Sequence, residues 1–134
     1  MTENSTREPD GIVTKLSPRP VPDTVARLTG ILREKGLKQF AVIDQSAEAA
    51  ASGLTLRETV LVIFGNPAAG TLVMQAAPLS ALDLPLKVLV WADGGQTKVS
   101  YVAPAELGAR YGLNAGQAAQ LAGIDPLTDA LVAP

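Results

Sequence analysis

Carboxylates are the strongest candidates for chemistry in this sequence. The 134 residues include no histidine and no cysteine. The usual general base near neutral pH and the ligands of a Cys/His zinc site are therefore missing. A serine triad has no base to use, and no glycine-rich phosphate-binding motif occurs. We predict no catalytic residue, no metal site and no cofactor.

Two of the carboxylates, Asp44 and Asp83, are candidates for a shared site. Asp44 ends a predicted strand at 38–44, and Asp83 precedes another at 84–92. Both could converge near the end of the strand predicted at 58–65. A carboxylate pair can transfer protons or hold a hard cation. The alternative is that each Asp begins a turn and caps nearby backbone, a common role for this residue.

A strand-to-helix segment, FGNPAAGT at 64–71, could bind a small ligand or an anion. Gly65 leads out of the strand, Asn66 is a good helix cap, and Pro67 suits the first helical position. Backbone N–H groups at a helix start attract anions, although an ordinary strand-to-helix turn has the same composition. We predict a small pocket bordered by Asp44, Phe64, Gly65, Asn66 and Asp83.

Hydrophobic spacing and turn residues predict the elements that position this segment. Val21, Val25, Leu28 and Leu32 follow the spacing of one buried helical stripe, in a helix capped by Asp23 and ended at Gly36. Further strands are expected at 11–17, 38–44 and 58–65, and further helices at 45–53, 66–77, 104–111 and 114–122.

A hairpin of two strands, 84–92 and 96–103, is predicted around the glycines at 94–95. Because side-chain direction repeats every two residues, one face of the hairpin is buried and Trp91 lies on the other. The expected core residues are Leu86, Val88, Val90, Val99 and Tyr101. The order of strands and helices indicates an α+β fold, with helices on one face of a mostly antiparallel sheet.

The chain divides into three predicted parts. Residues 1–10 are polar and predict a disordered tail. Residues 11–113 predict a single α+β domain, and residues 114–134 a C-terminal helical extension.

The tail lacks the apolar core of a secretory signal, so we expect a cytoplasmic protein. The net charge of −2 and the absence of a basic stripe argue against nucleic acid. No apolar run reaches the length of a membrane span, so no membrane partner is expected.

Apolar residues on both faces of the central strands predict a homodimer. Along 58–65, Leu61 and Ile63 point to one face, while Val62 and Phe64 point to the other. A solvated sheet face would be polar at every second position. The face away from the helices therefore needs a cover, supplied either by the segment after Asn114 or by a second subunit in two-fold contact. We favour the dimer.

Several segments also match a known family in order and spacing: FAVIDQS at 40–46, LVIFGNP at 61–67, GTLVMQA at 70–76, LPLK at 84–87 and SY at 100–101. They resemble the bacterial and archaeal family catalogued as domain of unknown function 302, over about residues 11–113. The resemblance implies a two-layer α/β sandwich, a dimer and no assigned activity. Many members carry histidine where this chain has Gln45 and Tyr111, so a role of those histidines would be lost here.

The leading hypothesis is a non-enzymatic, small-ligand-binding or regulatory homodimer, with its ligand near Asn66 and Pro67. Two alternatives stay open. One is an enzyme that uses Asp44 and Asp83, with or without Mg²⁺. The other is a protein-interaction module, for which the 47% hydrophobic content is the support.

Overall fold

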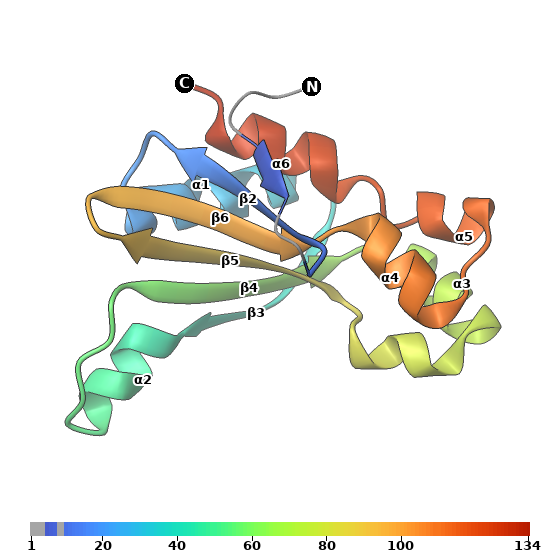
Figure 1. The fold of residues 1–134 in the computed structure, drawn as a ribbon, viewed down its shortest axis with the longest axis horizontal. Helices are drawn as coiled ribbons and strands as arrows, with labels where there is room; N and C mark the ends of the chain where they lie inside the picture. Colours follow the sequence, from blue (N-terminus) through green and yellow to red (C-terminus); the bar gives the residue numbers. More distant parts are fainter. Residues whose placement is uncertain (1–4, 8–9) are drawn as a thin grey trace.

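The computed structural model describes residues 5–7 and 10–134. Its centre is a six-stranded antiparallel sheet in the order β1-β2-β6-β5-β4-β3 (Figure 1). The strands are β1 (Ser5–Arg7), β2 (Ile12–Ser17), β3 (Lys38–Asp44), β4 (Thr59–Gly65), β5 (Leu86–Asp93) and β6 (Gln96–Val102). The α+β class is confirmed.

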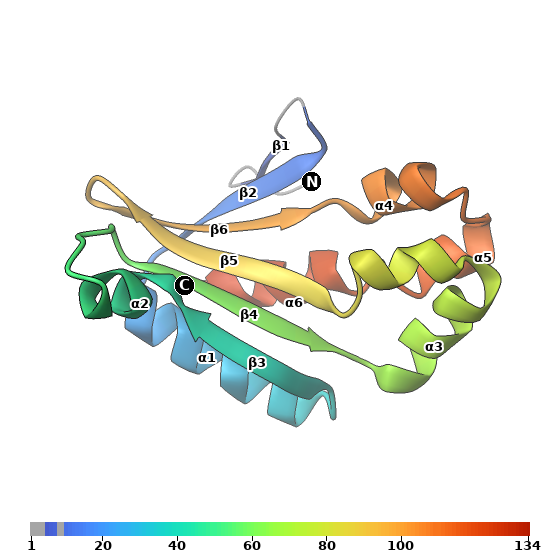
Figure 2. The ribbon, with the colours of Figure 1, turned by 90° about the horizontal axis from the view of Figure 1, so that it is seen from below.

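The helices form two groups. They are α1 (Val21–Glu34), α2 (Gln45–Ala51), α3 (Pro67–Ala76), the 3-10 helix η1 (Pro78–Leu82), α4 (Pro104–Tyr111), α5 (Ala115–Ala119) and α6 (Ile124–Val132). Helices α1 and α6 pack on one face of the sheet (Figure 2). At one end of the molecule lie α3, η1, α4 and α5, while α2 lies at the other end (Figure 1). No helix of the described residues has the length and apolar character needed to cross a bilayer.

The core follows the predicted alternation. Val88, Val90 and Val99 are completely buried, Tyr101 is nearly so, and the half-buried Leu86 packs against them. From α1, the buried side chains are those of Val21, Thr24, Leu28 and Leu32. The hairpin turns at Gly94 and Gly95, because Asp93 pairs directly with Gln96. The predicted core of the hairpin is therefore correct.

Two predicted boundaries need correction. Strand β1 pairs Ser5–Arg7 with Val13–Lys15, so this part of the expected disordered tail is a strand; residues 1–4 and 8–9 lie outside the described residues. Helix α1 begins at Val21, with Pro20 at the cap, so Asp23 lies in the first turn instead of capping the helix. The fixed φ of Pro22 suits the first turn and allows this earlier start.

The C-terminal helix α6 is held to β2 by a buried cation. Lys15, only 3% exposed, donates from Nζ to Thr128 Oγ1 at 2.7 Å and to the Asp125 carbonyl at 3.1 Å. The same Nζ lies 2.9 Å from an Asp129 carboxylate oxygen and 5.2 Å from the centre of the Tyr101 ring. The segment after 114 is thus part of the domain's core, and α6 lies on the same face as α1.

The opposite face of the sheet, which we call the open face, carries Leu61, Ile63, Leu89, Trp91 and Val102. These side chains are half-buried, and neither α1 nor α6 covers them. The indole N–H of Trp91 donates to Ser100 Oγ at 3.0 Å. Helix α6 is therefore excluded as the cover of this face, and of these five side chains only Val102 packs against a second cluster, which includes Leu121.

Candidate functional site: an apolar cavity beside helix α3

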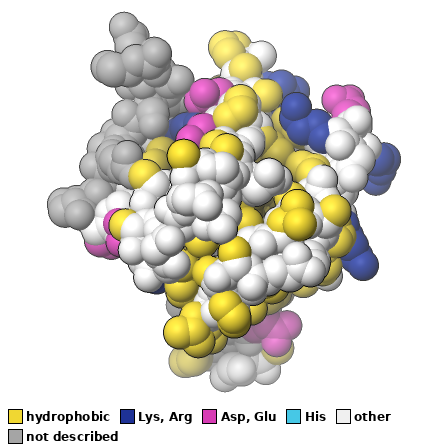
Figure 3. Space-filling view, turned by 90° about the vertical axis from the view of Figure 1, so that its right-hand side faces the viewer, with side chains coloured by type: hydrophobic (Ala, Val, Ile, Leu, Met, Phe, Trp, Pro, Cys, Tyr) yellow, Lys and Arg dark blue, Asp and Glu magenta, His cyan; other side chains and the backbone are white. Residues whose placement is uncertain are grey.

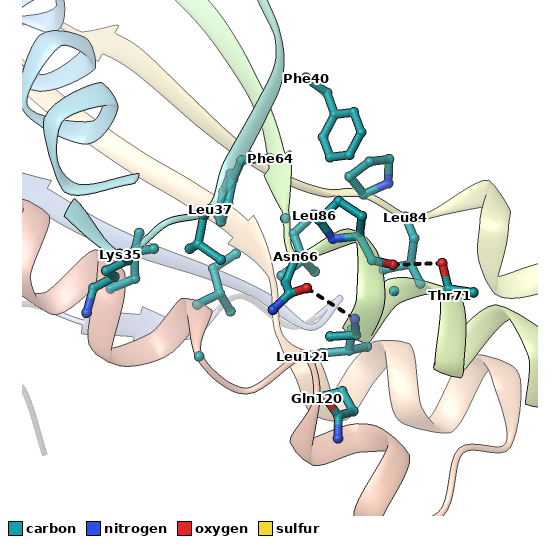
Figure 4. A pocket seen from close by; sticks show the side chains of 18 of the residues that line it. Lys35, Leu37, Phe40, Phe64, Asn66, Thr71, Leu84, Leu86, Gln120 and Leu121 are labelled. Carbon is teal, nitrogen blue, oxygen red and sulfur yellow. Dashed lines mark hydrogen bonds between the residues drawn. The ribbon is translucent and has the colours of Figure 1, made fainter. Parts of the chain in front are cut away.

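A cavity of about 710 Å³ lies where β4 ends and α3 begins. Its apolar wall includes Phe40, Phe64, Met74, Leu84, Leu121 and Leu127 (Figure 4). These side chains come from the starts of β3 and β5, the end of β4, α3, and the C-terminal segment. A volume in the range of 300–1,000 Å³ with mostly apolar walls is typical of small-molecule sites.

Small residues keep this space open. Gly65, Ala69 and Gly70 all line the cavity. A Cβ at Gly70 would meet its nearest neighbour, Met74 Cε, only at 3.9 Å. Protein interiors are normally packed close to crystal density. An opening of this size is therefore a feature of the fold that a ligand could fill.

Few polar groups reach the cavity, and none of its lining residues is acidic. Lys35, Asn66, Thr71 and Gln120 supply the polar and charged side chains (Figure 4). Lys35 directly follows α1 and is exposed. The Thr71 hydroxyl donates to the carbonyl of Pro67 at 2.7 Å. Among the described residues that line the cavity, Lys35 alone carries a formal charge, and its ammonium group points away from the other labelled side chains (Figure 4).

Asn66 caps α3, as predicted. Its Oδ1 accepts the backbone N–H of Ala68 at 3.0 Å and of Ala69 at 3.3 Å. Gly70 N–H donates to the Asn66 carbonyl at 3.0 Å, and Pro67 has no N–H. The backbone donors of the first turn therefore have acceptors within the protein, so an anion here would have to be held by side chains.

Replacing Asn66 by alanine should lower the free energy of unfolding by about 1 kcal/mol, because two backbone donors lose their acceptor. Asn66→Asp keeps an acceptor oxygen at the same place and adds a negative charge at a helix N-terminus, so it should stay close to wild type. Urea denaturation followed by circular dichroism measures both variants. Equal stability of wild type and Asn66→Ala would contradict the capping role.

Three of the five predicted site residues, Phe64, Gly65 and Asn66, line the cavity, and Asp44 does not. Asp44 pairs with Val60, at the end of β4 opposite to Asn66. Its carboxylate accepts from Ser46 Oγ at 2.6 Å and from Ala47 N–H at 2.9 Å, which caps α2. These hydrogen bonds, the one from Ser46 above all, hold the pKa of Asp44 below its ordinary value. The predicted pocket that includes Asp44 is therefore wrong.

Asp83 also lies outside the cavity lining. Its carboxylate accepts hydrogen bonds from the hydroxyl of Tyr111 and, at 2.9 Å, from Arg110 Nη1. The bond from Tyr111, followed by the contact with Arg110, lowers the pKa of Asp83 against the opposing effect of burial. Asp83 thus ties the entry to β5 onto α4. Because Asp44 and Asp83 lie at opposite ends of β4, the geometry of a carboxylate pair is absent.

No group of three or more acidic side chains among the described residues is arranged to hold a metal ion. The lining residues that sequence reasoning missed include Lys35, Phe40, Leu84 and those of the C-terminal segment. Phe40 lies at an irregularity in the pairing of β3 with β4 and is 42% exposed. The local signal that could have placed Phe40 at a binding site is the basic residue Lys38 two positions before it. In the structure, Lys38 Nζ lies 5.0 Å from the centre of the Phe40 ring.

Solved and curated proteins resemble this chain at three levels. The fold matches the crystal structure of an uncharacterized conserved protein DUF302 from Bacillus stearothermophilus, with a TM-score of 0.77, 20% identity, and coverage of 91% of this chain and 95% of that one. Over 104 residues, 77% of this chain, it is 38% identical to proteins named fluoride-specific ion channel FluC 1 in Brucella suis and Brucella abortus. The chain spans only 41% and 38% of their respective lengths.

A family model supplies the last comparison. The model described as "Domain of unknown function DUF302" matches residues 13–131, which include the wall of the cavity, all of α1 and all of α6 except Val132. The match extends past residue 113, in agreement with α6 being part of the core. This chain therefore belongs to the DUF302 family.

Proposed function

We propose that the domain binds a small amphipathic molecule, with an apolar body and one negatively charged group, in the cavity beside α3. The observation that carries the proposal is the cavity itself. Its volume is about 710 Å³, its walls are mostly apolar, and its lining residues include one lysine and no acidic residue. Apolar walls with a few convergent polar groups are the usual form of a small-molecule site.

Charge favours an anionic group on the ligand. Lys35 supplies the cation, and the amides of Asn66 and Gln120 can donate hydrogen bonds. The cap uses Oδ1 of Asn66, which leaves the NH₂ group of that side chain available to a ligand. A medium-chain carboxylate matches this arrangement, with its chain against Phe64 and Leu121 and its carboxylate at the edge of the cavity, where the exposed side chain of Lys35 turns to meet it.

Calorimetric titration with decanoate and with decanol tests the proposal. Decanoate should bind, and decanol more weakly, because the alcohol has no charge for Lys35. In Lys35→Met, which keeps the length of the side chain, the affinity for decanoate should fall to that for decanol. Binding of neither compound would contradict the proposal, and equal binding of both by wild type would contradict the role of Lys35.

We further propose that the domain is a homodimer through its open face. The apolar side chains of that face, such as Leu89 and Trp91, remain uncovered by α1 and α6. Large apolar patches of this kind are rare on monomers, and a two-fold contact is the commonest way to bury one.

Light scattering of the purified protein should give a molar mass in solution that is twice the 13.8 kDa of one chain. Leu89→Lys, which places a charge at the centre of the open face, should give the mass of a monomer. Leu79→Lys is the matched control: Leu79 is 71% exposed on η1, outside the sheet, so this variant should stay dimeric. A monomer mass for wild type at micromolar concentration would contradict the dimer.

The curated relatives favour a second candidate, an accessory role toward a fluoride channel. In proteins named as such channels, a segment similar to this domain makes up about two fifths of the chain. Domains joined in one protein often act on each other. The test adds the domain to liposomes that contain a fluoride channel and measures fluoride efflux; an unchanged rate would contradict this candidate.

A further inference from the structure

The segment 67–82, which forms α3 and η1, has no charged residue. Three of its leucines project into solvent: Leu72 is 58% exposed, Leu79 71% and Leu82 76%. Hydrophobic side chains gather on this end of the molecule, with Lys and Arg along one side (Figure 3). Leu79 and Leu82 share the short helix η1, and apolar side chains that gather at one end of a molecule usually mark a surface that contacts another apolar body. We call Leu72, Leu79 and Leu82 the leucine patch.

The leucine patch and the cavity share one helix. Gly70, Thr71 and Met74 of α3 line the cavity, while Leu72 of the same helix is exposed. Helix α3 therefore lines the cavity and also carries Leu72, while Leu79 and Leu82 lie on the 3-10 helix η1 that follows it. Two cations lie near the cavity: Lys35 is one of its lining residues, and Lys38 lies over the ring of Phe40, another lining residue.

We infer that the leucine patch docks on the surface of an anionic membrane, from which the cavity takes its ligand; the second clause rests on the proposed function. A bilayer surface offers acyl chains to the leucines and negative head groups to Lys35 and Lys38. The ligand class deduced from the cavity, an acyl chain with an acidic group, has the same chemistry. A protein partner would account for the leucines, but not for this agreement with the cavity.

This inference concerns contact with a membrane surface and not a span. No apolar run of the sequence reaches the length of a membrane span, but the sequence cannot show which leucines are exposed. Surface-bound segments need only an apolar face that enters the boundary between head groups and acyl chains. The uncharged segment 67–82 presents such a face, without a charged side chain that would have to be desolvated.

Co-sedimentation with vesicles tests the inference. Wild type should pellet with vesicles of phosphatidylcholine and phosphatidylglycerol in equal parts, and less with phosphatidylcholine alone. The double variant Leu79→Asp, Leu82→Asp should pellet at least on the order of tenfold less. Leu54→Asp is the matched control, because Leu54 is 68% exposed near α2, at the other end of the molecule (Figure 1). It should pellet like wild type.

Decanoate titration of the same variants separates this inference from the proposed function. The double variant should keep its affinity for decanoate, because neither leucine lines the cavity. Decanoate binding by a wild type that does not pellet would overturn the docking inference and leave the proposed function in place. Pelleting without decanoate binding would support docking and contradict the role of the cavity. A loss of dimer mass in the double variant would make the patch a protein interface and overturn docking.

Discussion

Gly70→Leu is expected to lower the affinity for decanoate by a factor on the order of ten or more, without loss of stability. Gly70 lies within α3 and lines the cavity. An added Cβ fits, since its nearest neighbour would be Met74 Cε at 3.9 Å. The rest of the leucine side chain would then occupy space that the ligand needs. Replacing an interior helical glycine by a strong helix former should itself add up to about 1 kcal/mol of stability.

Gly30→Leu is the matched control for this variant. Gly30 also lies inside a helix, α1, has no atom within 4 Å of an added Cβ, and does not line the cavity. Its substitution should raise stability by a similar amount and leave the affinity for decanoate unchanged. Calorimetric titration and urea denaturation of both variants supply the two measurements. Full affinity in Gly70→Leu would mean that decanoate binds elsewhere on the protein.

The ion pair between Lys15 and Asp129 should respond very differently to loss of one partner or the other. Asp129→Asn leaves a buried ammonium group without its counter-charge, and removing one partner of a buried pair in this way costs about 3 kcal/mol. Lys15→Met removes the buried charge and keeps an apolar side chain of similar length. The Asp129 carboxylate that remains is 44% exposed and can be hydrated. Lys15→Met should therefore cost about 1 kcal/mol or less.

Urea denaturation at neutral pH measures both variants. Loss of Lys15 should leave the Thr128 hydroxyl hydrogen-bonded, because this hydroxyl also donates to the Ile124 carbonyl at 2.7 Å. Tyr101, whose pKa is raised chiefly by burial, remains protonated and continues to donate to Asp125. The prediction is contradicted if Lys15→Met lowers the free energy of unfolding more than Asp129→Asn does. In that case the hydrogen bonds of Lys15 to Thr128 and the Asp125 carbonyl would stabilise the protein more than its ion pair with Asp129 does.

Local signals predicted most of the elements. The cap and first residue of α3, Asn66 and Pro67, and the glycine at 36 with its positive φ each mark a boundary through a property of one or two residues. Alternation in β5 and β6 identified the buried face of the hairpin, because successive side chains of a strand point to opposite faces of the sheet. These are effects within a few residues, which a sequence displays directly.

The site was predictable only where it is local. Phe64, Gly65 and Asn66 are consecutive and were identified together, whereas Leu121 and Leu127 reach the cavity from the C-terminal segment through tertiary packing. Asp44 was misplaced for a geometric reason. In an antiparallel pair the end of one strand lies beside the start of the next, so the end of β3 meets Val60 and not Gly65. Sequence alone did not give the direction of that pairing.

The pairing of β2 with β6 has a consequence for synthesis on the ribosome. Strands β3, β4 and β5 each pair with the next strand along the chain, so the part of the sheet from β3 to β6 can assemble as it emerges. Strand β2 is made before them, yet the bond between Thr14 and Ser100 spans 86 residues. Its edge must therefore wait, unpaired, until β6 leaves the exit tunnel. Closure of this long loop should set the folding rate.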